Sequence, residues 1–247
     1  MSRNFELLQN LGREPELFSS AALPVRDEGQ APTQFAHGFG VDPEIAQLCQ
    51  RLFAGGVEVA GARVVTFCSV QPATSEGKIC AHTAMTLASS VNRSVCVVDS
   101  NLLSPSLHKF FGVHNQSGFG EAVMSASALT SHARQIRDSN LTLITAGNAM
   151  PDPQALASES TAFRLHELRA HFNYVLINGP AVPDRGQAVF LGRLSDGIVL
   201  IVEANSTRRD AAMRVRSEME QANVPVLGAV LNNRTFPIPD ALYCKLF

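Results

Sequence analysis

The chain has no tryptophan, only two tyrosines, and no excess of charge of either sign among its 247 residues. Its 20 Lys and Arg residues against 22 Asp and Glu residues give a formal net charge of -2 at pH 7. Proteins that bind nucleic acid carry a basic surplus on one face, so we expect no nucleic-acid partner. The five cysteines include no C-x-x-C pair. Their odd number favours buried, reduced thiols in a cytoplasmic protein over a zinc site or a disulfide framework.

Long hydrophobic runs are also missing. The run GIVLIV at residues 197–202 has six residues, whereas a membrane-spanning helix needs about 20. The first residues, MSRNFELLQN, lack the apolar stretch of a secretory signal peptide. We therefore expect a cytoplasmic protein that reaches the inner face of a membrane only through a protein partner.

Composition divides the chain near residue 42. Residues 3–11 predict a short helix, and residues 12–41 are rich in Pro, Gly, Ser and Gln with little periodicity, which is typical of a linker. In DPEIAQLCQRLF, Asp42 can cap a helix and Pro43 suits its first turn. We expect an N-terminal helix and flexible linker in residues 1–41, and one α/β domain in residues 42–247.

From residue 62 onward, unbroken runs of Val, Ile and Leu alternate with helical patterns. Apolar runs without polar alternation are typical of parallel strands that are buried on both faces. We therefore expect an α/β fold, a mostly parallel sheet with helices on both faces, whose ligand site lies at the carboxyl ends of the strands. Strands are expected at 62–70, 94–100, 140–147, 172–179, 196–204 and 225–233, and helices at 77–91, 106–112, 160–171 and 206–223.

The segment SEGKIC, residues 75–80, stands between the first strand and the first helix of this alternation. A phosphate-binding loop reads G-x-x-x-x-G-K-S/T: its backbone N–H groups and lysine hold phosphates, and its hydroxyl binds Mg²⁺. Gly77 and Lys78 match this pattern, but Pro72 replaces the first glycine and Ile79 replaces the hydroxyl residue. The loop alone is therefore a weak match, and an ordinary strand-to-helix turn is the alternative.

Further motifs follow in a fixed order: PSLHKFFG at 105–112, NLTLITAGNAMPDPQALASE at 140–159 and FNYVLINGPAV at 172–182. Together with SEGKIC they resemble the cytoplasmic domain of bacterial tyrosine kinases (BY-kinases, CpsD/CapB-like), over residues 42–233. The resemblance implies a P-loop NTPase fold of the ParA/MinD type and ATP-dependent tyrosine autokinase chemistry with Mg²⁺. It also implies homo-oligomers and a membrane-anchored polysaccharide co-polymerase partner of the chain-length-determinant (Wzz) type.

The resemblance assigns roles to individual residues. Lys78 matches the phosphate lysine and Asp99 matches the aspartate near the attacking hydroxyl, so these two are the catalytic candidates if the protein is active. The nucleotide-binding candidates are Glu76, Gly77, Lys78, Ile79, Cys80, Asn101 and Asn178.

Three of these positions differ from the family pattern, and each difference removes a group that could bind a metal ion. Ile79 stands where the family has a metal-binding hydroxyl, and Asn101 and Asn178 stand where it has aspartates. Mg²⁺ prefers carboxylate, phosphate and water oxygens, and phosphoryl transfer depends on neutralising charge. We therefore expect no Mg²⁺ site, at most weak ATP binding, and a regulator of exopolysaccharide or capsule synthesis whose kinase and ATPase activity is lost or strongly reduced.

Two other family features are also weak. The tail FPIPDALYCKLF carries a single tyrosine, Tyr243, which is either a lone phosphosite or a packing residue, in place of a tyrosine cluster. The helix at 42–53 lacks most of the charged E-x-x-R-x-x-R contact of ring assembly. Two alternatives stay open: an active tyrosine autokinase that tolerates a degenerate site, which Lys78 and Asp99 support, and a partition or positioning ATPase of the ParA/MinD class.

Overall fold

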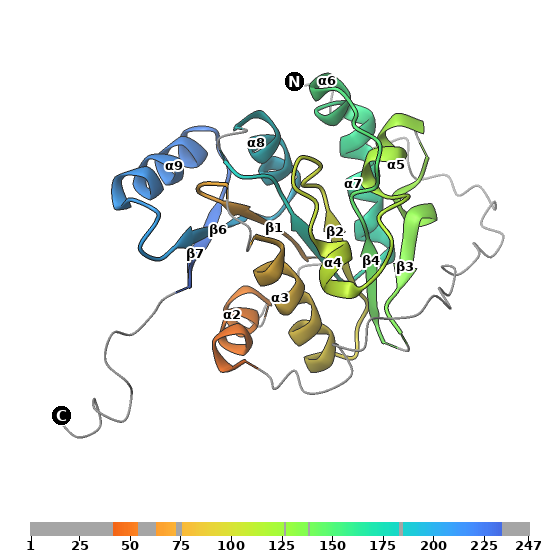
Figure 1. Cartoon of the computed structure of the whole chain (residues 1–247), viewed down its shortest axis with the longest axis horizontal. Helices are drawn as coiled ribbons and strands as arrows, with labels where there is room; N and C mark the ends of the chain where they lie inside the picture. Colours follow the sequence, from red (N-terminus) through yellow and green to blue (C-terminus); the bar gives the residue numbers. More distant parts are fainter. Residues whose placement is uncertain are drawn as a thin grey trace, which may run out of the picture.

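The computed structural model describes residues 42–53, 63–72, 76–125, 127–137, 139–182 and 185–233, without the side chains of Glu76 and Arg185 (Figure 1). The N-terminal helix and linker expected in residues 1–41 lie outside these described residues, and so does Tyr243. The two-part division of the chain therefore stays a prediction.

The centre of the molecule is a seven-stranded sheet in the order β3-β4-β2-β5-β1-β6-β7. All neighbouring strands pair in parallel except β3 and β4, which pair antiparallel. The mostly parallel sheet is thus confirmed, and the short antiparallel β3 is an element that the sequence did not predict. The strands are β1 (Arg63–Ser69), β2 (Val95–Asp99), β3 (Ala133–Gln135), β4 (Leu141–Ile144), β5 (Tyr174–Asn178), β6 (Ile198–Glu203) and β7 (Val226–Asn232).

The expected helices at the phosphate loop, after β2, before β5 and after β6 are all present. Three further helices, α5, α6 and α8, were not predicted, because their short or mixed sequences show no clear helical period. The helices are α2 (Pro43–Phe53), α3 (Glu76–Ser90), α4 (Leu107–Phe111), α5 (Phe119–Ser125), α6 (Pro153–Leu156), α7 (Glu159–His171), α8 (Arg185–Leu194) and α9 (Arg209–Gln221), with a 3-10 turn η2 (Leu129–His132).

Alternate residues of each central strand contribute to two separate layers of core. In β1, Val65 and Phe67 join the cluster formed with α2, α3 and α4, whereas Val64 and Cys68 join clusters formed with α5, α7, α8 and α9. Figure 1 shows the same division, with α2 and α3 on one side of the sheet and α8 and α9 on the other. Burial on both faces explains why the strands read as unbroken apolar runs.

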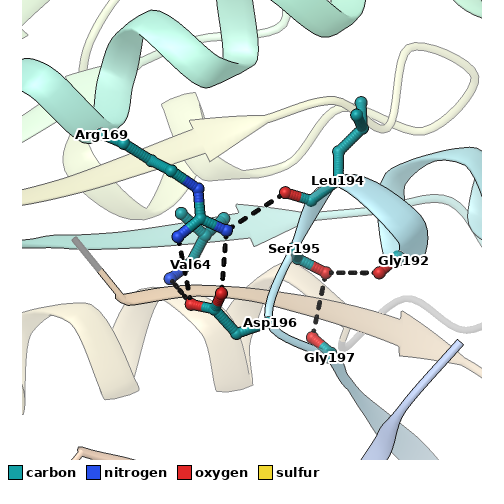
Figure 2. A network of polar contacts seen from close by, with 7 residues as sticks. All are labelled: Val64, Arg169, Gly192, Leu194, Ser195, Asp196 and Gly197. Atoms are coloured by element: carbon teal, nitrogen blue, oxygen red, sulfur yellow. Dashed lines mark hydrogen bonds and ion pairs between the residues drawn. The ribbon is translucent and has the colours of Figure 1, made fainter. Parts of the chain in front are cut away.

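The amino-terminal edge of the sheet is fixed by a polar network around Asp196 (Figure 2). The Asp196 carboxylate accepts hydrogen bonds from the backbone N–H of Val64 at 2.7 Å and from Arg169 Nη2 at 2.9 Å. Arg169 also donates to the carbonyl oxygen of Leu194 at 3.3 Å. This network ties α7 and the end of α8 to the start of β1. It lies at the opposite edge of the sheet from the carboxyl ends of the strands, where a ligand site is expected. None of the described helices is long and apolar enough to cross a membrane.

Candidate functional site

The phosphate-loop candidates lie where β1 ends and α3 begins, at the carboxyl edge of the sheet. Residues 73–75 lie outside the described residues, so the shape of the loop itself is not described. Gly77 is buried and Lys78 is exposed in the first turn of α3. A helix N-terminus with an exposed lysine is suited to hold phosphate. The start of α3 and Lys78 therefore have the groups that phosphate binding needs.

Gly77 is in close contact with the segment that leads into α4. A Cβ atom added to Gly77 would lie 2.0 Å from Ser106 Oγ and 3.0 Å from Ser106 Cβ. A side chain at position 77 would therefore force Ser106 to move. The glycine of the loop therefore serves packing against Ser106, whatever it contributes to phosphate binding.

The Asp99 carboxylate, at the end of β2, is completely buried and accepts four hydrogen bonds. Its Oδ2 accepts from the backbone N–H groups of Ser106 and Leu107, both at 2.9 Å. Its Oδ1 accepts from the side-chain amide of Asn178 at 2.8 Å and from the backbone N–H of Asn101 at 3.3 Å. A carboxylate offers about four lone-pair directions, so those of Asp99 are occupied by protein donors.

Two of these bonds cap α4 from a distance. The side chain of Ser106 itself makes no capping hydrogen bond, and Asp99 supplies the acceptor that the first N–H groups of α4 need. Burial raises the pKa of Asp99, while the bonds from Leu107, Asn178, Ser106 and Asn101 lower it in part. Asp99 thus acts in this structure as a structural carboxylate that joins β2, β5 and α4.

The two asparagines that stand at aspartate positions of the resembled family, Asn101 and Asn178, lie beside Asp99. Asn178 is completely buried, and the carbonyl oxygen of its backbone accepts from the N–H and the hydroxyl of Ser100, both at 2.9 Å. Asn101 is nearly buried, and its Oδ1 accepts from Ser104 N–H at 3.1 Å. The backbone of Asn178 and the side-chain amide of Asn101 thus hold the loop that follows β2.

Ile79 and Cys80 point into the core rather than toward the loop. Ile79 is 7% exposed and Cys80 is fully buried, and both belong to the cluster between α3 and the sheet. Burial raises the pKa of the Cys80 thiol well above its usual value, and the nearby charges of Asp99 and Cys68 add to this rise. Cys80 is therefore an inert packing thiol.

The residues present do not fit a Mg²⁺ ion. Asn178 presents its N–H₂ group, a donor, to Asp99, whereas Mg²⁺ needs oxygen lone pairs at near-octahedral positions. Ile79 brings a hydrocarbon to the hydroxyl position. Among the described residues, no group of three His, Cys, Asp or Glu side chains is placed to hold a metal ion.

Some polar contacts at this edge were not predicted. Gln187 of α8 donates to the carbonyl oxygen of Ser100 at 3.1 Å, and α8 itself had no clear sequence signal. At the ends of β6 and β7, the Glu203 carboxylate accepts from the side-chain amides of Asn232 at 2.9 Å and Asn233 at 2.8 Å. The dipeptide NN after an apolar strand is the signal that could have directed attention to this second cluster.

No protein-family model matches the chain. In sequence it is 26% identical over 165 residues to the putative tyrosine-protein kinase CapB of Staphylococcus aureus, covering 66% of the chain and 72% of CapB. It is 23% identical over 171 residues to the tyrosine-protein kinase YwqD of Bacillus subtilis, covering 69% of the chain and 72% of YwqD. The chain is thus similar in sequence to proteins named as bacterial tyrosine kinases.

The chain is also similar in sequence to part of a larger transport protein. Over 188 residues the chain is 24% identical to the succinoglycan biosynthesis transport protein ExoP of Rhizobium meliloti, covering 74% of the chain and 23% of ExoP. The resemblance to bacterial tyrosine kinases that the motifs indicate is confirmed by the similarity to CapB and YwqD, which are named as tyrosine-protein kinases.

Solved structures confirm the fold. The chimerical protein CapA2B2 superposes with a TM-score of 0.71 at 20% identity, over 78% of this chain and 85% of that one. The MinD cell division protein of Aquifex aeolicus superposes with a TM-score of 0.58 at 16% identity, over 70% of each chain. The predicted α/β fold with a mostly parallel sheet is therefore correct, and it is shared with CapA2B2 and with MinD.

Proposed function

We propose that this chain is a BY-kinase-like regulator of exopolysaccharide or capsule synthesis whose kinase and ATPase activity is lost or strongly reduced. The observation that carries the proposal is the hydrogen bond from the Asn178 amide to Asp99. The amide donates a hydrogen bond to the buried carboxylate, and a neutral side chain at position 178 adds no second negative charge that a cation would have to balance.

The chemistry that remains is phosphate binding. The N-terminus of α3 and Lys78 can attract the phosphates of ATP, but without Mg²⁺ the charge that builds up during phosphoryl transfer stays unbalanced. Asp99 is buried and bonded to four donors, so it has no access to an attacking hydroxyl in this arrangement. We infer weak nucleotide binding that is indifferent to Mg²⁺.

The proposed partner is a membrane-anchored polysaccharide co-polymerase of the chain-length-determinant type, which would bring the protein to the inner face of the membrane. Support comes from the relatives alone: one is a succinoglycan biosynthesis transport protein that is several times longer than the matched region. Binding of such a partner is independent of catalysis, so a protein with a silent site can still regulate polymer synthesis.

Titration with ATP in a calorimeter, with and without Mg²⁺, tests the proposal. We expect no heat, or weak binding unchanged by Mg²⁺, and no autophosphorylation with labelled ATP. The triple variant Ile79→Thr, Asn101→Asp, Asn178→Asp restores the missing oxygens, and we expect it to gain Mg²⁺-dependent ATP binding. The exposed change Asn92→Asp is the matched control and should gain nothing.

A second test measures polymer synthesis in the cell. If regulation does not need ATP, Lys78→Ala should leave the polymer level and chain length that the protein supports unchanged. Micromolar, Mg²⁺-dependent ATP binding by the unmodified chain, with autophosphorylation that Tyr243→Phe removes, would overturn the proposal. That result would establish the active-autokinase alternative.

A further inference from the structure

The imidazole ring of His132, at the end of the 3-10 turn η2, lies between two serine hydroxyls. Its Nδ1 is 2.6 Å from Ser117 Oγ, and its Nε2 is 2.8 Å from Ser127 Oγ. The two serines come from different segments, since Ser117 precedes α5 and Ser127 follows it. These residues lie outside the candidate nucleotide site. The sequence did not predict their contact, because Ser117 and His132 are 15 positions apart.

The end of β4 brings Ser117 and His132 together. The register of the antiparallel strands β3 and β4, continued by one residue, sets His132 opposite Thr145. Ser117 is held by the same residue, because its carbonyl oxygen accepts from Thr145 Oγ1 at 2.9 Å. The backbone N–H of Phe119 donates to the carbonyl oxygen of Thr145 at 2.8 Å. The hydroxyl and the imidazole are thus positioned against one strand, which fixes their mutual geometry.

The count of hydroxyl protons determines which ring nitrogen carries the hydrogen. The Ser125 hydroxyl donates its one proton to the carbonyl oxygen of Glu121 at 2.6 Å. In its 2.8 Å contact with Ser127, Ser125 therefore accepts. Ser127 has then used its own proton, and it accepts from Nε2–H of His132. Nδ1 of the neutral ring is left as an acceptor, so the hydroxyl of Ser117 donates to it.

A serine hydroxyl that donates to a neutral imidazole has the arrangement of a nucleophile and its general base. Burial lowers the pKa of His132, and the negative charge of Glu121 raises it in part. The ring is therefore neutral at pH 7, and Glu121 stabilises the imidazolium that forms when the ring takes up a proton. Ser127 holds the ring in the tautomer that can accept, which is the part of the third group in a catalytic triad.

The hydroxyl lies where a small molecule can reach it. Ser117 is partly exposed, and both His114 and Gln116, just before it in the sequence, are exposed. Its backbone is already held by Thr145, so the reaction needs no movement of the chain to bring nucleophile and base together.

We propose that Ser117 is a reactive serine that accepts an acyl group from a small activated ester, with His132 as its general base. Ser117 Oγ attacks the carbonyl carbon of the ester while the hydroxyl proton passes to Nδ1 of His132. The bond between the carbonyl carbon and the leaving oxygen then breaks, and the imidazolium returns the proton to the leaving group. Ser117 becomes an ester and His132 is neutral again. This inference goes beyond the proposed function and does not depend on it.

Incubation of the full chain with p-nitrophenyl acetate tests the proposal. Absorbance follows the release of p-nitrophenolate, and mass spectrometry of the intact chain and its peptides locates the acetyl group. We expect one acetyl group per chain, on Ser117, and none there in Ser117→Ala. Loss of the base in His132→Gln should slow the acetylation at least about 100-fold. The exposed changes Ser89→Ala and His114→Gln are the matched controls and should react like the wild type.

Nitrogen NMR of the His132 ring gives a second readout on the unmodified chain, which does not depend on how well a variant folds. We expect a hydrogen on Nε2 and none on Nδ1 at pH 7. Ser127→Ala removes the acceptor of Nε2–H. It should therefore populate the other tautomer and slow the acetylation of Ser117.

A hydrogen on Nδ1 in the unmodified chain would overturn the proposal, because the hydroxyl of Ser117 would then have no base. Acetylation that is confined to lysine or cysteine residues would contradict it as well. The same holds if His132→Gln is acetylated on Ser117 as fast as the wild type.

Discussion

The side-chain amide of Asn178 donates a 2.8 Å hydrogen bond to Oδ1 of Asp99 between the neighbouring strands β5 and β2. Both side chains are completely buried. An aspartate at position 178 would place two carboxylates in direct contact, and they could coexist only with a shared proton or a cation. The asparagine avoids this repulsion, because its neutral amide donates to Asp99 instead.

The first prediction follows from that contact. Asn178→Asp should lower the free energy of unfolding by about 2–4 kcal/mol at pH 7 without Mg²⁺, because two buried carboxylates repel each other. Millimolar Mg²⁺ should restore part of the loss. Urea unfolding with and without Mg²⁺ measures both effects, with the exposed Asn92→Asp as control; a variant as stable as the wild type would contradict this account of Asn178.

The second prediction concerns Asp99 and pH. Asp99→Asn should cost about 1–3 kcal/mol at pH 7, because its N–H₂ group would face the N–H donors of Ser106 and Leu107. Burial raises the pKa of Asp99 above its ordinary value in the unfolded chain. The stability that Asp99 contributes is therefore complete below that ordinary value and is lost as the pH rises through the raised pKa.

The gap between wild type and Asp99→Asn should accordingly widen as the pH is lowered from 7 toward 4. Urea unfolding at several pH values measures it, and the exposed Asp210→Asn should show no such trend. A gap that narrows toward acid pH would mean that the four hydrogen bonds outweigh burial at this carboxylate.

The third prediction concerns the contact between the phosphate loop and α4. Gly77→Ala should destabilise the protein by about 1–2 kcal/mol, because the new Cβ meets Ser106. Ser106→Gly removes the obstructing side chain, so the double variant should recover part of the loss. A double-mutant cycle from urea unfolding measures the coupling, and strict additivity of the two changes would show that α4 and the loop are not packed as described.

The fourth prediction concerns the opposite edge of the sheet. Asp196→Ala removes the acceptor of Val64 N–H and the partner of Arg169 (Figure 2), which should cost about 1–3 kcal/mol. Nucleotide binding, measured by calorimetry, should be unchanged because the network lies at the amino ends of the strands. By comparison, Glu220→Gln, which breaks the exposed pair with Arg216 at 2.8 Å, should cost less than about 0.5 kcal/mol.

The sequence alone determined the alternation of strands and helices, because strands buried on both faces must be apolar throughout. Runs such as VVTFC and VCVVD correspond to β1 and β2 within one or two residues. It also determined the family resemblance and the replacement of a hydroxyl residue at position 79 and of aspartates at positions 101 and 178 relative to the pattern of that family, since these depend only on residue identity.

Only the tertiary structure decided which groups surround Asp99. The bonds that Asp99 makes to Asn178, Ser106 and Leu107 join residues up to 79 positions apart, and no local pattern records such pairings. The same reason explains why the contact of Gly77 with Ser106 was not predicted. Burial and hydrogen-bond partners depend on which strands become neighbours, and that order is set by packing of the whole sheet.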